Sequence, residues 1–146
     1  MSTVLAVDPG KTTGYALWTD GERVEGELYA EAFLDYAESV LKTGTVDTVV
    51  CERFIITTRT GKLSHAPWSL EQIGALRHLC HVHRVNFVLQ NVSDAKKFGT
   101  DQRLNLLGWK RPQGAGHARD AQRHLLVHLV RTKELSASEL LEAAQD

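Results

Sequence analysis

Three short runs of apolar residues constrain the fold more than any other feature of this sequence. Residues 4–7 (VLAV) show no polar alternation, a pattern typical of a strand buried on both faces of a sheet. Similar runs follow at 46–51 (VDTVVC) and 85–90 (VNFVLQ), and segments with helical spacing separate them. Strands joined through helices usually lie parallel, so we expect a sheet with helices on its faces.

The first third of the chain predicts an antiparallel meander. Pro9 and Gly10 permit a sharp turn into a second strand over 14–18, and the Asp20-Gly21 turn leads into a third strand over 23–29. Helical spacing and start signals predict helices at 30–42, 69–83, from Ser93, 101–107 and 117–132. The order βββαβαβ followed by helices predicts an α/β fold with a mixed five-stranded sheet flanked by helices.

Length and composition favour a single globular domain over 1–146, with an acidic tail over about 134–146. A hydrophobic fraction of 42% is ordinary for a soluble protein. We see neither a secretory signal nor an apolar run near the ~20 residues of a membrane span, so we expect a cytoplasmic protein with no membrane partner. Cys51 and Cys80 lie in a predicted strand and a predicted helix, which favours buried thiols over a disulfide.

The net charge of −1 hides a strong asymmetry along the chain. Residues 1–50 carry −6, residues 51–133 carry +9 and the tail carries −4. A basic middle and back half indicates a positively charged face, as in proteins that bind nucleic acids. Solvated helix faces would produce part of the same count, so the charge alone does not decide the partner.

Two carboxylates stand where buried strands end. Asp8 follows the first apolar run and Glu52 follows the second, at the edge where open α/β sheets build their sites. On its own, Asp8 is also an ordinary turn residue that bonds its own backbone. If the two strands are neighbours, the acids lie side by side. On the last helix, His117 and Asp120 are three residues apart and share a face away from the apolar stripe.

Three crowded carboxylates repel one another, and a divalent cation would relieve this repulsion. Oxygen ligands with at most one imidazole suit Mg²⁺ or Mn²⁺ better than zinc. The segment HLCHVH (78–83) offers His78, Cys80 and His81, but no second Cys/His pair at suitable spacing follows, which disfavours a zinc site there.

The segments VDPGKTTGYAL, VVCERF and GHARDA, in this order on this element pattern, resemble the RuvC-type Holliday junction resolvases of the RNase H-like (retroviral integrase) superfamily. The resemblance covers Thr3 to about Arg131, and it is compatible with a phage or a bacterial source. It implies an RNase H-like fold and a catalytic centre that binds two Mg²⁺ or Mn²⁺ ions. The implied catalytic and metal-binding residues are Asp8, Glu52, His117 and Asp120.

The resemblance also implies contacts with DNA. Phe54 is a candidate for a side chain that stacks on unpaired bases, and packing in the core is an equal alternative. Lys11 is either a phosphate contact or an exposed turn residue. The full set of candidate DNA-binding residues is Lys11, Phe54, Arg59, Lys62, Lys96, Lys97, Lys110 and Arg111.

The function expected from this resemblance is a metal-dependent, structure-selective endonuclease that resolves Holliday junctions, and other branched DNA, in recombination and repair. A homodimer suits the two-fold symmetry of a four-way junction, and no small-molecule cofactor is expected. Two alternatives stay open: an RNA-processing nuclease of the pre-16S rRNA type, and a non-catalytic nucleic-acid-binding module of the same fold. An ATPase-like phosphate-binding domain is disfavoured by size, because actin-like enzymes enclose the nucleotide between two such domains.

Overall fold

The computed structural model describes residues 2–58, 66–136 and 138. The strands of this part of the chain form one sheet in the order β3-β2-β1-β4-β5. β1 pairs antiparallel with β2 and parallel with β4, and the outer pairs are β2 with β3 (antiparallel) and β4 with β5 (parallel). The strands are β1 Thr3–Asp8, β2 Thr12–Thr19, β3 Glu22–Tyr29, β4 Thr48–Glu52 and β5 Asn86–Gln90. The predicted meander is confirmed, and the first and fourth strands are neighbours, which is the condition for Asp8 and Glu52 to lie side by side.

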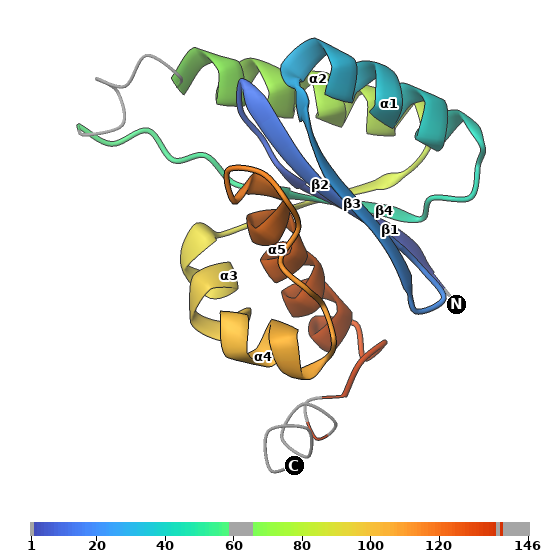
Figure 1. Ribbon diagram of the computed structural model, residues 1–146. Helices are drawn as coiled ribbons and strands as arrows, with labels where there is room; N and C mark the ends of the chain where they lie inside the picture. Colours follow the sequence, from blue (N-terminus) through green and yellow to red (C-terminus); the bar gives the residue numbers. More distant parts are fainter. Residues whose placement is uncertain (1, 59–65, 137, 139–146) are drawn as a thin grey trace.

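The helices cover both faces of the sheet (Figure 1). One layer contains α1 (Ala30–Lys42) and α2 (Ala66–His83). The other contains α3 (Val92–Phe98), α4 (Asp101–Leu106) and the long α5 (His117–Arg131). The predicted α/β fold with a mixed sheet flanked by helices is therefore correct.

Two apolar cores lie on the two faces of the sheet. Alternate residues of β1 face opposite layers, so that Val4 and Ala6 pack with Leu125 of α5 while Leu5 and Val7 pack with Phe33 of α1. All four β1 residues are 0% exposed. This double burial explains why the first strand is continuously apolar.

Several element boundaries differ from the sequence-based expectation by one to three residues. β4 begins at Thr48 rather than at residue 46; Asp47 precedes it, and its carboxylate accepts a hydrogen bond from the Thr3 N–H at 2.8 Å. α2 begins three residues earlier than expected, at Ala66. α3 begins at Val92 with Asn91 as its N-cap, so the predicted start at Ser93 is wrong by one residue.

Both cysteines, Cys51 and Cys80, are free and buried, as predicted. No helix among the described residues combines the length and apolarity that crossing a bilayer requires. Most of the acidic tail predicted over 134–146 lies outside the described residues.

β2 passes directly under the first turn of α5 at Gly14. A Cβ atom added to Gly14 would overlap the backbone carbonyl of His117. Gly14 pairs with Asp8 on one side and with Glu27 on the other. A glycine at this position therefore lets the start of α5 rest on the sheet beside Asp8.

We expect Gly14→Ala to lower the free energy of unfolding by about 1–3 kcal/mol, because α5 must shift to admit the methyl group. Gly74→Ala is the matched control: it lies within α2 with no atom near the added methyl group, and should raise stability by about 0.5–1 kcal/mol. Denaturant unfolding of both variants tests this difference, and equal effects would contradict the close approach at Gly14.

Candidate functional site

The carboxylates of Asp8 and Glu52 meet at the carboxyl ends of two adjacent parallel strands. Val7 pairs with Cys51, so Asp8 and Glu52 are the next residues along β1 and β4. Both side chains lie on the α5 side of the sheet, as do Ala6 and Val50 two residues earlier. Asp8 is only 6% exposed, and its carboxyl interacts directly with that of Glu52.

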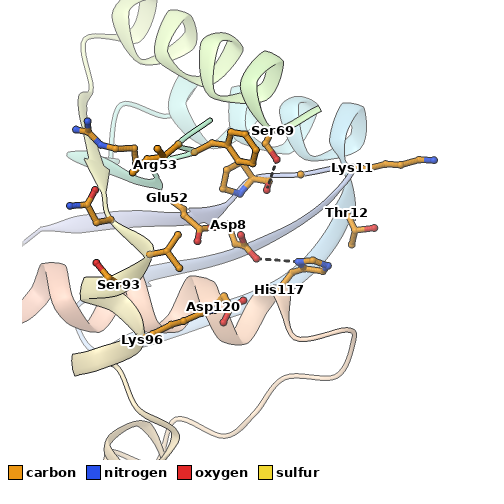
Figure 2. Close-up of a pocket in the computed structure, with 16 residues that line it drawn as sticks. Asp8, Lys11, Thr12, Glu52, Arg53, Ser69, Ser93, Lys96, His117 and Asp120 are labelled. Carbon is orange, nitrogen blue, oxygen red and sulfur yellow. Dashed lines mark hydrogen bonds and ion pairs between the residues drawn. The ribbon is translucent and has the colours of Figure 1, made fainter. Parts of the chain in front are cut away.

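α5 brings His117 and Asp120 to the same place. His117 is the first residue of the helix, and its Nδ1 lies 3.1 Å from Asp8 Oδ2. Asp120 is one turn further on and is partly exposed. Figure 2 shows the side chains of Asp8, Glu52, His117 and Asp120 directed toward a common space. The structure thus brings together the four residues that the sequence analysis selected.

A cavity of about 950 Å³ opens above these residues. Three of the candidate DNA-binding residues also line it: Lys11, Phe54 and Lys96. Phe54 is half-buried on the cavity wall, so its position agrees with an accessible aromatic side chain rather than with a core residue. Lys11 lies over the ring of Trp68, with 5.9 Å between its Nζ and the ring centroid.

Other candidate DNA-binding residues lie away from this cavity. Lys97 lines a smaller cavity between α3 and α5, of about 230 Å³. Lys110 and Arg111 are exposed on the segment that joins α4 to α5. Arg59 and Lys62 lie outside the described residues.

Burial raises the pKa of Asp8 to about 8, and the neighbouring carboxylates of Glu52 and Asp120 add to this effect. Burial alone would also raise the pKa of Glu52, but interactions with His124 and Asp8 lower it below its ordinary value. Without a cation, the two carboxyls therefore differ: the pKa of Asp8 is raised, although its contact with His117 opposes this, and the pKa of Glu52 is lowered.

The donor set fits a hard divalent cation in its chemistry. Three carboxylates and one imidazole line a single cavity, and a cation there would offset the repulsion between the Asp8 and Glu52 carboxylates. Within the described ranges, no three His, Cys, Asp or Glu side chains converge closely enough to hold one ion. Asp120 also contacts Arg123, whose Nε lies 3.2 Å from Asp120 Oδ1.

The structure adds two residues to the site that the sequence analysis did not select. His124 is 1% exposed, and its Nδ1 lies 2.7 Å from Gln90 Oε1 while its Nε2 faces Glu52 at 3.8 Å. His124 was not predicted as a site residue, although it follows Asp120 by four residues and so shares its face of the helix. Gln90 ends β5 and pairs with Glu52.

We expect Asp8→Asn to stabilise the metal-free protein increasingly as the pH rises from 4 to 8. Unfolded Asp8 loses its proton near pH 4 and folded Asp8 near pH 8, so the wild-type protein loses stability over this range, whereas an Asn does not titrate. At pH 8 the gain in the free energy of unfolding should exceed about 1 kcal/mol. Denaturant unfolding with a chelator at several pH values measures it, and a difference that does not change with pH would contradict the raised pKa.

Comparison with models of protein families and with curated proteins finds no match for this sequence. Comparison with solved structures finds RuvC of Thermus thermophilus in complex with a Holliday junction substrate, with a TM-score of 0.70 and 14% identity over 92% of this chain and 96% of that one. A second structure of Thermus thermophilus RuvC has a TM-score of 0.63 and 16% identity, over 90% and 96% of the two chains. The chain therefore has the RuvC-type, RNase H-like fold.

Proposed function

We propose that this protein is a metal-dependent endonuclease that cuts branched DNA and has the four-way Holliday junction as its main substrate. One observation carries the proposal: two strand-end carboxylates, His117 and Asp120 line a cavity that also holds Lys11, Phe54 and Lys96. The fold supports it, because a protein of this fold has been solved with a Holliday junction.

In this proposal Asp8, Glu52 and Asp120 hold Mg²⁺ or Mn²⁺, and His117 is a further ligand or positions the attacking water. When bound, two such ions supply an activated water and stabilise the leaving oxygen of the phosphodiester. The chain itself fixes the acids: the β1 and β4 strand ends hold Asp8 and Glu52, and α5 presents Asp120. Arg123, whose Nε lies 3.2 Å from Asp120 Oδ1, offsets part of the negative charge at the cavity wall.

The DNA-binding part of the proposal uses the cations and the aromatic side chain around the cavity. Lys11 and Lys96 would contact phosphates close to the cleaved bond, and Phe54 would stack on an unpaired base at the branch point. Lys97, Lys110 and Arg111 would contact phosphates further along the arms. A homodimer would place two such sites on opposite strands of a junction, in line with its two-fold symmetry.

We expect Asp8→Asn to abolish cleavage of a labelled four-way junction in Mg²⁺ or Mn²⁺ and to leave binding intact or stronger, because it removes a metal ligand and a negative charge near the phosphates. Asp35→Asn, at an exposed position of α1 on the other layer, is the matched control and should cut normally. Flap, linear duplex and structured RNA substrates, with and without chelator, complete the assay.

The outcomes separate the possible functions. Paired, symmetric nicks in the junction that need both the metal and Asp8 support the proposal. Cutting mainly of flaps widens it to a general branched-DNA nuclease, and cutting mainly of RNA replaces it with an RNA-processing nuclease. Tight junction binding without cleavage by the wild-type protein would contradict the enzyme and leave a recognition module.

We expect Lys96→Gln, made in the Asp8→Asn background, to weaken junction binding and to reduce the slope of log K against log salt by about 0.9, the value for one lost phosphate contact. Lys42→Gln, on α1 in the opposite layer, should leave the slope unchanged. Fluorescence anisotropy over a range of salt concentrations measures both. Equal slopes for the two variants would remove Lys96 from the DNA-binding surface.

A further inference from the structure

Glu27, on β3, holds the start of α5 with its carboxylate. The backbone N–H of Ala115 donates to Glu27 Oε1 at 3.0 Å. The N–H groups of His117 and Ala118 donate to Oε2 at 3.0 and 3.3 Å. A side chain from the far side of the meander thus binds backbone groups that lie 88 to 91 residues away in sequence.

The helix needs an external acceptor at this end. The first N–H groups of any α-helix lack partners within the helix, and a side chain at the N-cap usually binds one of them. Here the N-cap is Gly116, which has a positive φ of 98° and no side chain to offer. Glu27 takes that role, and its negative charge also suits the positive end of the helix dipole.

The same contact reaches the candidate site. His117 donates its N–H to Glu27, and its ring Nδ1 lies 3.1 Å from Asp8 Oδ2 on β1. Gly14 lies between Glu27 and Asp8 in the sheet and leaves room for the helix backbone. Two residues of the sheet, Glu27 and Asp8, therefore hold the first turn of α5. Asp120 lies within that turn. Glu27 is not among the residues that line the cavity.

We propose that Glu27 is a positioning residue. By binding the backbone of the first turn of α5, it places the His117 ring next to Asp8 and directs Asp120 toward the cavity. This inference rests on the proposed nuclease function of the site. Glu27 acts through the helix, so its loss should impair the chemical step and leave DNA binding unchanged.

Glu27→Gln is the test variant, because the amide keeps the length of the side chain but has one acceptor oxygen, and its NH₂ group meets N–H donors. Glu22→Gln is the matched control, since Glu22 is exposed on the same strand. We expect Glu27→Gln to lower kcat for junction cleavage at saturating metal by about 10- to 100-fold, as a misplaced group can. Junction affinity should stay within about twofold of wild type, because the phosphate contacts are untouched.

A second measurement keeps the test independent of catalysis. NMR of the metal-free protein should show faster exchange of the Ala115, His117 and Ala118 amides in Glu27→Gln and displaced ring signals of His117, with neither change in Glu22→Gln. Unchanged ring signals together with unchanged kcat would overturn the inference, and so would an equal loss of kcat and junction affinity. If the wild-type protein cuts no nucleic acid, the proposed function fails, and the ring signals alone decide whether Glu27 positions His117.

Discussion

The docking of α5 across the polar end of the sheet is the contact on which the rest of this structure depends. One row of residues crosses the sheet and faces the helix. It consists of Glu27 on β3, Gly14 on β2, Asp8 on β1, Glu52 on β4 and Gln90 on β5. Polar contacts with this row occur at the first turn of α5 and again at His124, two turns later. Beyond the row, the apolar stripe of the helix packs on Val4 and Ala6. The same face of the helix thus covers the apolar core and contributes polar side chains to the site at the end of the sheet.

A second set of contacts holds α5 on its outer side. The guanidinium of Arg119 is 2% exposed, yet it donates to four acceptors: Asp101 Oδ1, Asn105 Oδ1, the Trp109 carbonyl and Gln122 Oε1. A buried cation is tolerated only when it is paired and hydrogen-bonded in this way. Arg123 joins this network through Asp101 and extends it to Asp120. The segment before α5 is therefore bound to α5 through the hydrogen bond from Arg119 to the Trp109 carbonyl.

Much of this arrangement could be predicted from the sequence, and the parts that could not have a common physical cause. The continuous apolar runs predicted β1 and β4, and the acids that end them predicted Asp8 and Glu52, because strand burial and strand ends are local properties of a sequence. Glu27 was missed because its partners are backbone groups, which leave no trace in residue type. Lys97 and Lys110 were grouped with Lys96. Lys97 is the next residue of the same helix, so it points about 100° away from Lys96 and lines another cavity. The course of the segment that carries Lys110 depends on packing that no local pattern records.

The residues of the candidate site are far apart in the sequence, and this separation bears on when the site forms during folding. Asp8 and His117 are separated by 109 residues, and Glu52 lies between them in the chain. A nascent polypeptide presents both strand acids long before it contains the helix that faces them, and contacts so distant in sequence form late because closing a long loop costs entropy. The cavity therefore comes into being with the completion of the tertiary structure. A partly synthesised or truncated chain without α5 carries two of the four side chains and lacks the two that face them.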